Sequence, residues 1–293
     1  MLPSVQPFAR PPHRGPMRRF AETRGLLGGH GVPHGVTQLR ARDGTRLEAS
    51  YLPGPPAAPV AVLLLHGFGA HRRKPAYAAL ADGLASVAPV LALDLRGHGG
   101  SGGSSTFGDR EEADVHAGGA WLRGFGHARI VVVGLSMGAT AAIHAVWLGM
   151  PVTAIVAISA PARFRDPAPA GPLRRLETLW HSDLQRRALR AGLGVSLAAP
   201  TAWRSPPDPE RMVADVTQPL LLVHGEDDAY FPLEDAARLA ARHAGTSTVW
   251  QEGPGFGHAE DGITPAFVER LGRAVIEVAH SGRYPDARTS RDG

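Results

Sequence analysis

The stretch Ile130–Ala142, with the sequence IVVVGLSMGATAA, decides the fold of this 293-residue chain. The β-branched residues at its start favour a buried strand, and the small residues at its end favour a helix. Between them lies GLSMG (134–138), a Gly-x-Ser-x-Gly pattern. A serine on a sharp strand-to-helix turn needs glycines on both sides, where a Cβ would obstruct the neighbouring backbone. The pattern therefore predicts that Ser136 projects from the sheet edge at a helix N-terminus, where partial positive charge favours a developing anion.

Short apolar runs alternate with helical patterns along the rest of the chain. We predict strands at Arg46–Leu52, Val60–His66, Val90–Leu95, Ile130–Gly134, Val152–Ser159, Leu220–His224 and Thr246–Glu252. Helical spacing is found at Tyr77–Val87, Glu111–Phe125, Met137–Leu148, Leu233–His243 and Phe267–Ala279. Strands that are apolar on both faces and separated by helices predict an α/β fold, with a mostly parallel central sheet covered by helices on both sides.

The alternation of strands and helices also suggests domain boundaries. Residues 1–35 are rich in Pro, Arg, Gly and His and have little apolar surface to bury, so we predict a flexible tail there and a second one at 283–293. The core is expected at 36–160 and 218–282. Residues 161–217 interrupt the alternation with two helical patterns and a Pro-rich stretch. A connection of that length usually carries structure of its own, and we predict a small helical cap inserted over the sheet edge.

Composition excludes several classes of protein. The chain has no cysteine, which rules out disulfides, thiolate catalysis and cysteine-ligated metals. The formal charge of +4 is concentrated in the first twenty residues, so a nucleic-acid-binding surface is not supported. No apolar run approaches the roughly 18 to 20 residues of a membrane-spanning helix. The N-terminus lacks the apolar stretch of a secretory signal, and we expect a cytoplasmic protein.

Four blocks of sequence resemble the α/β-hydrolase family over about residues 39–281. They are LHGFG (65–69), DLRGHG (94–99), GLSMG (134–138) and HGEDD (224–228), and Gly257-His258 follows them. The resemblance is to serine esterases and lipases with a helical cap. In this family the triad is ordered Ser, Asp, His along the chain, which implies Ser136 as nucleophile, Asp228 as the orienting acid and His258 as general base.

The spacing of the three residues suits this assignment. Asp228 follows Ser136 by 92 residues, which leaves room for one strand and the cap, and His258 comes 30 residues later in a Gly-rich loop. Alternatives for the acid are the neighbouring Asp227, more weakly Glu226, and Asp166, which lies where some family members carry it. A serine that only caps a helix and a histidine that is only structural are the simpler interpretations of Ser136 and His258, and the order of the blocks argues against both.

Similarity to the family implies that the backbone amides of Phe68 and Met137 form the oxyanion hole. We expect His66 and the turn at 94–99 to be structural. In the cap, Leu176 and Trp180 are candidate substrate-binding residues. Further apolar wall is expected from Leu173, Leu179, Leu184 and Leu193.

These observations predict a serine hydrolase that cleaves a carboxylic ester, or less favourably a thioester or amide, through an acyl-enzyme. The mechanism needs neither metal nor cofactor, and the expected partner is a small, apolar acyl substrate. Dehalogenases and epoxide hydrolases of this fold need an acid in place of Ser136, which disfavours those activities. The remaining alternatives are an acyltransferase, a C–C bond hydrolase or a cofactor-free peroxidase with the same triad, a non-catalytic binding protein, and an assembly protein that acts through its tail. The residues do not predict the oligomeric state.

Overall fold

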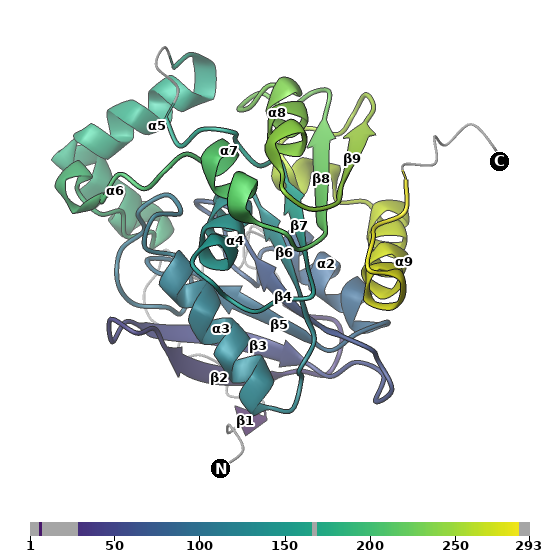
Figure 1. Cartoon of the computed structure of the whole chain (residues 1–293). Coiled ribbons are helices and arrows are strands. Elements are labelled where there is room, and N and C mark those ends of the chain that lie inside the picture. The colour runs from purple at the N-terminus through teal and green to yellow at the C-terminus, as the bar shows by residue number, and fades with distance from the viewer. Residues whose placement is uncertain (1–5, 8–28, 166–168, 287–293) are drawn as a thin grey trace.

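A single nine-stranded sheet runs through the described part of the protein (Figure 1). The computed structural model describes residues 29–165 and 169–286, together with the backbone of residues 6–7. The strands are β1 (Gln6–Pro7), β2 (Gly35–Arg40), β3 (Arg46–Leu52), β4 (Ala61–Leu65), β5 (Val90–Asp94), β6 (Ile130–Leu135), β7 (Ala154–Ile158), β8 (Leu220–Gly225) and β9 (Ser247–Glu252). Their order across the sheet is β1-β2-β3-β5-β4-β6-β7-β8-β9. The pairs β1–β2, β2–β3 and β3–β5 are antiparallel, and all other neighbouring pairs are parallel.

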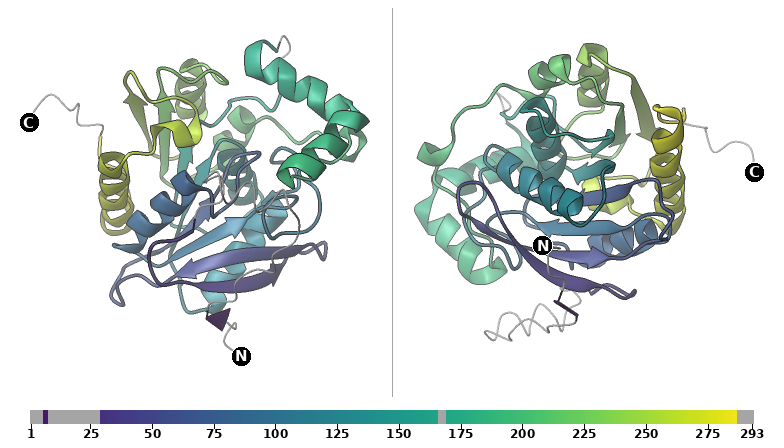
Figure 2. Two further views of the ribbon diagram at one scale, coloured as in Figure 1. Left: turned by 180° about the vertical axis from the view of Figure 1, so that it is seen from behind. Right: turned by 60° about the horizontal axis from the view of Figure 1, so that its bottom comes forward.

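Helices cover both faces of the sheet, as the parallel strands require. The helices are α2 (Pro75–Ala85), α3 (Glu112–Gly124), α4 (Met137–Trp147), α5 (Gly171–His181), α6 (Asp183–Leu193), α7 (Pro209–Met212), α8 (Glu234–Arg242) and α9 (Pro265–Ser281), with short 3₁₀ turns at Pro200–Ala202, Val213–Asp215 and Ala259–Gly262. Helix α3 lies in front of the sheet in Figure 1, and α2 comes forward in the reversed view of Figure 2. None of the described helices is both long and apolar enough to cross a membrane.

The central strand β4 shows how the sequence builds two cores. Successive side chains of a strand point to opposite faces of the sheet. Leu63 and Leu65 join the cluster under α3 and α4, whereas Val62 and Leu64 join the cluster under α2 and α9. All residues of β4 to β8 are buried, which explains why these strands read as continuous apolar runs.

The predicted α/β architecture is confirmed, and each predicted strand and helix is present with its ends shifted by at most two residues. Strand β2 was not predicted. Its buried positions are occupied by Gly35, Thr37 and Leu39, so the alternation is present but only one of the three inward residues is strongly apolar. A strand that pairs at the antiparallel edge of the sheet therefore has a weak hydrophobic signal.

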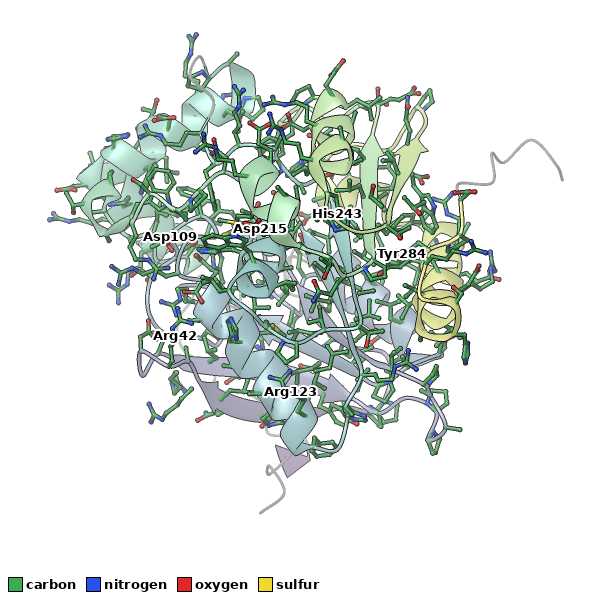
Figure 3. All side chains as sticks on the ribbon, in the orientation of Figure 1. Arg42, Asp109, Arg123, Asp215, His243 and Tyr284 are labelled. Atoms are coloured by element: carbon green, nitrogen blue, oxygen red, sulfur yellow. The ribbon has the colours of Figure 1, made fainter. Side chains whose placement is uncertain are left out.

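The segment predicted as a cap divides into two parts. Helices α5 and α6 project from the body of the molecule at the upper left of Figure 1. After them the chain returns to the core, where Arg204 donates from its amide (2.6 Å) and its Nε (2.9 Å) to the carboxylate of Asp109, which is labelled in Figure 3. Helix α7 then packs against α4 and α8 in the layer that covers the sheet.

The end of the predicted N-terminal tail contacts helix α2. The amide of Gly31 donates to Asp82 Oδ2 at 2.6 Å, and His30 Nδ1 lies 3.1 Å from Asp82 Oδ1. Most of the remainder of both predicted tails, residues 1–5, 8–28 and 287–293, lies outside the described residues.

We expect Leu63→Ala to lower the free energy of unfolding by about 2–5 kcal/mol, because the side chain is fully buried in the centre of the sheet and its removal leaves a cavity. Chemical denaturation followed by circular dichroism measures this. The matched control is Leu184→Ala on α6, where the leucine is 77% exposed, and a change within about 0.5 kcal/mol is expected. Equal losses in the two variants would contradict the burial argument.

Candidate active site

Ser136 occupies a strained turn between β6 and α4. Its φ of 52° and ψ of −117° are unfavourable for a residue with a Cβ. The two flanking glycines make the turn possible, because a Cβ on Gly134 would lie 2.4 Å from the carbonyl oxygen of Gly138. A Cβ on Gly138 would lie 2.7 Å from the carbonyl oxygens of Leu65 and His66. The turn therefore presses the start of α4 against the end of β4.

His258 lies between the other two residues predicted for the triad. Its Nε2 is 2.9 Å from Ser136 Oγ, and its Nδ1 is 3.0 and 2.9 Å from Oδ1 and Oδ2 of Asp228. The three residues follow β6, β8 and β9, whose carboxyl ends lie at one edge of the parallel part of the sheet. The imidazole can accept the hydroxyl proton at Nε2 while the carboxylate holds the proton on Nδ1.

The Asp228 carboxylate is stabilised in its ionised form. Its side chain has no solvent exposure, and its Oδ1 accepts hydrogen bonds from the amides of Tyr230 (2.8 Å) and Phe231 (3.0 Å). Burial by itself raises the pKa of Asp228, but the hydrogen bonds from His258 and from these two amides outweigh it. The pKa of Asp228 is consequently below the ordinary value of 3.8. An ionised acid at this position fixes the tautomer of His258.

The alternative acids lie elsewhere. Asp227 accepts a hydrogen bond from the amide of Gly255 at 2.7 Å, so it braces the loop that precedes His258. Glu226 is exposed and accepts from Gln251 at 3.2 Å. Asp166 lies outside the described residues.

The loop that carries His258 is held from two sides. Ser159, at the end of β7, is fully buried and its Oγ accepts a hydrogen bond from the amide of Ala259 at 2.9 Å. Tyr230 lies over the imidazole of His258, with ring centroids 4.4 Å apart. These contacts restrict the imidazole to the orientation in which it faces Ser136.

Phe68 and Met137, the predicted oxyanion donors, both line the cavity beside Ser136. The amides on either side of Phe68 are already used, because Gly67 donates to Tyr77 Oη at 3.0 Å and Gly69 donates to His98 Nε2 at 3.1 Å. Met137 is the first residue of α4, so its amide has no acceptor within the helix. Within the described residues, neither the amide of Phe68 nor that of Met137 donates a hydrogen bond, so both are available to an anion.

Comparison with known proteins identifies the family of this chain. The sequence model of the Alpha/beta hydrolase family matches residues 62–280. The chain belongs to this family.

Several solved structures share the fold of this α/β hydrolase. Esterase Pf2001 of Pyrococcus furiosus is 21% identical, with a TM-score of 0.63 over 93% of this chain and 97% of that one. Esterase RhEst1 of Rhodococcus sp. ECU1013 is 21% identical, with a TM-score of 0.63 over 83% and 98%. Esterase EaEST of Exiguobacterium antarcticum is 19% identical, with a TM-score of 0.62 over 84% and 99%. At these identities the likeness concerns the fold.

The hydrolase has an aromatic-lined cavity of about 240 Å³ above Ser136. Leu176 and Trp180, predicted from the cap, both line it, as does Leu173. Leu179, Leu184 and Leu193 do not line it, contrary to expectation. Leu184 and Leu193 lie on α6 with exposures of 77% and 67%. Helical spacing alone does not show which side of a cap helix faces the core.

Sequence reasoning did not identify most of the cavity's aromatic rings. Besides Trp180 and Phe68, the latter predicted for its amide, the cavity is lined by five aromatic residues in loops: Phe107, Phe164, Trp203, Tyr230 and Phe231. The only sequence signal for them is an aromatic residue within a glycine- or proline-containing loop, which is too general to single them out. In the described residues no group of three or more histidine, aspartate or glutamate side chains is arranged to hold a metal ion.

His66 acts as a brace for the loop that carries Phe68. Its Nε2 accepts from the amide of Leu95 at 3.0 Å, so its Nδ1 carries the proton and donates to the carbonyl oxygen of Gly67 at 2.7 Å. Burial lowers the pKa of His66 from 6.5 to about 3. The folded protein therefore keeps this ring neutral over a wide range of pH.

We expect part of the acid sensitivity of folding to come from His66. Below pH 6.5 the unfolded chain binds a proton at this residue and the folded protein does not until about pH 3, so stability falls as the pH is lowered between these values. His66→Gln should reduce the slope of unfolding free energy against pH in this window by up to about 1.4 kcal/mol per unit. Urea titrations from pH 7 to pH 4 measure the slope. Identical slopes in the two proteins would refute the assignment of a buried neutral ring.

Proposed function

We propose that the protein is a serine esterase in which Ser136 is the nucleophile, His258 the general base and Asp228 the residue that orients the histidine. The observation that carries the proposal is the position of His258, within 3.0 Å of both the Ser136 hydroxyl and the Asp228 carboxylate. The complete set also favours an enzyme over a non-catalytic binding protein, because binding alone does not need an aligned base and acid.

The proposed reaction has two halves. Ser136 Oγ attacks the ester carbonyl while His258 Nε2 takes the hydroxyl proton, and the amides of Phe68 and Met137 hold the oxyanion. The tetrahedral intermediate collapses, and His258 returns the proton to the departing alcohol. Water then enters, and its oxygen attacks the acyl carbonyl while His258 Nε2 removes its proton. The bond between the acyl carbon and Ser136 Oγ breaks, the acid leaves, and His258 returns the proton to Ser136 Oγ. Asp228 stabilises the imidazolium in both halves.

Two further observations support an ester as substrate. The solved structures that share the fold include several proteins named as esterases. Most side chains that line the cavity above Ser136 are aromatic or aliphatic, and the three arginines among the others are paired with Glu177 or Glu210. This lining suits an apolar acyl group better than a charged one. Its volume of about 240 Å³ lies below the roughly 300–1,000 Å³ of pockets for drug-sized ligands, which favours a small ester over a long-chain lipid.

Ser136→Ala should abolish both labelling by a fluorophosphonate probe and turnover of p-nitrophenyl esters, with a loss of about 10⁴-fold or more in kcat. Both readouts depend on the same hydroxyl group. Gel fluorescence and release of p-nitrophenolate measure them. A variant that still hydrolyses esters at the wild-type rate, or a wild-type protein that neither labels nor turns over any ester, would overturn the proposal.

Asp228→Asn should lower kcat by about 10³- to 10⁴-fold, because an amide can donate to Nδ1 and then stabilises the wrong tautomer of His258. Asp227→Asn is the matched control. It changes the adjacent residue in the same way, but the new side chain keeps an oxygen that can accept from Gly255, so little change is expected. Steady-state assays with p-nitrophenyl acetate make the comparison. If the Asp227 variant loses more activity than the Asp228 variant, the assignment of the acid is wrong.

A further inference from the structure

Phe107 has a strained backbone that the proposed chemistry does not require. Its φ of 53° places a bulky residue in the left-handed region, where side chains other than glycine, asparagine and aspartate are uncommon. Such a conformation persists only where the surrounding structure enforces it, and it is characteristic of functional sites. Phe107 also lines the cavity above Ser136.

A buried carboxylate enforces this conformation. Glu111 is fully buried and accepts hydrogen bonds from the amides on both sides of Phe107, those of Thr106 (2.7 Å) and Gly108 (3.0 Å). It also accepts from the hydroxyl groups of Ser105 and Thr106, at 2.8 and 2.7 Å. These bonds fix the loop before any substrate arrives.

The loop that contains Ser105 and Phe107 also contacts the segment that follows α6. The amide of Ser105 donates to the carbonyl oxygen of Ser196 at 2.7 Å. The amide of Ala198 in turn donates to the carbonyl oxygen of Ser105 at 2.9 Å. Trp180 Nε1 donates to the carbonyl oxygen of Ala198 at 3.1 Å. The indole of Trp180 is therefore tied, through Ala198, to the loop that presents Phe107.

The result is a continuous row of aromatic rings from the core to the cap. The ring of Phe107 lies 4.6 Å from that of Phe68 and 5.3 Å from that of Trp180, and the latter pair is edge-to-face at 82°. Trp180 in turn meets Trp203 edge-to-face, with centroids 5.6 Å apart. All four rings line the cavity.

We propose that Phe68, Phe107, Trp180 and Trp203 form an aromatic subsite, and that it binds an aromatic ring in the acyl group of the substrate. The inference rests on the proposed esterase function. The leaving oxygen must lie near His258 to receive its proton, and the ring of Tyr230, which also lines the cavity, lies 4.4 Å from that imidazole. In the proposed reaction the carbonyl oxygen faces the amides of Phe68 and Met137. The ring of Phe68 lies 4.6 Å from that of Phe107, so the subsite adjoins the proposed oxyanion hole, and we assign it to the acyl group.

The chemistry of the subsite favours an uncharged aromatic ring over an aliphatic or a cationic group. Fixed rings in edge-to-face arrangement interact with another ring through their quadrupoles in addition to burying its area. The indole rings already have a cation against them, because the Arg165 guanidinium, which is paired with Glu177, is 5.6 Å from the Trp180 ring and 5.8 Å from the Trp203 ring. The small cavity volume fits one ring on a short spacer.

The experiment compares p-nitrophenyl phenylacetate with p-nitrophenyl cyclohexylacetate, which share the leaving group and the spacer and differ only in the aromaticity of the ring. The ratio of their kcat/KM values is measured in the wild type, Phe107→Leu and Trp180→Leu. Each variant should lower the phenylacetate preference by about two- to tenfold, because leucine keeps apolar area and removes the ring. Phe125→Leu, a ring that stacks on Trp121 and does not line the cavity, should leave the ratio unchanged.

The outcomes separate this inference from the proposed function. Turnover that depends on Ser136, with the same ratio in the wild type and both subsite variants, would overturn the aromatic subsite and leave the esterase intact. An aromatic preference found only when the alcohol is varied, with benzyl and cyclohexylmethyl acetates, would also overturn it. Failure of the wild type to hydrolyse any ester would overturn both. Thermal melts show that each variant is folded, and the use of two subsite variants keeps the test decisive if one of them is unstable.

Discussion

The site depends on one constraint, the close contact between the start of α4 and the end of β4 at the turn that follows β6. Ser136 has a positive φ because the chain must reverse from a buried strand into a helix within one residue. The reversal brings Gly138 against the carbonyl oxygens at the end of β4. Ser136 and the loop that carries Phe68 are thereby held together. The geometry that the proposed reaction needs is thus enforced by packing in the centre of the sheet, where displacement is most costly.

The parallel topology supplies the remaining partners. Strands β6 to β9 run in the same direction, so residues that follow them gather at one edge although they are far apart in sequence. Ser136, Ser159 and Asp228 follow β6, β7 and β8, and His258 comes after β9. Ser136 and Asp228 share hydrogen bonds with the imidazole of His258, and Ser159 accepts one from the amide of the adjacent Ala259. Three different loops therefore restrain the imidazole.

Buried carboxylates organise the loops around this edge. Glu111, Asp109 and Asp94 are each fully buried, a costly placement that is offset because each accepts several hydrogen bonds from nearby backbone or side chains. Glu111 holds the conformation of Phe107, Asp109 attaches the returning cap segment through Arg204, and Asp94 accepts from the amides of Arg72 and Gly100. Loops without regular structure acquire fixed shapes in this way, and the shape of the cavity follows from them.

The sequence alone determined the α/β architecture, nearly every strand and helix, and the short list of triad candidates, because hydrophobic periodicity and the spacing of glycines are local properties. It did not determine β2, whose inward residues include Gly35 and Thr37. Only the tertiary structure decided that Asp228 and not Asp227 faces His258, since adjacent residues differ only in the direction of the side chain. It also decided that Trp180 lines the cavity while Leu184 faces solvent, and that Phe107 joins the cavity wall. These outcomes depend on contacts between segments distant in sequence, and local patterns carry no information about such contacts.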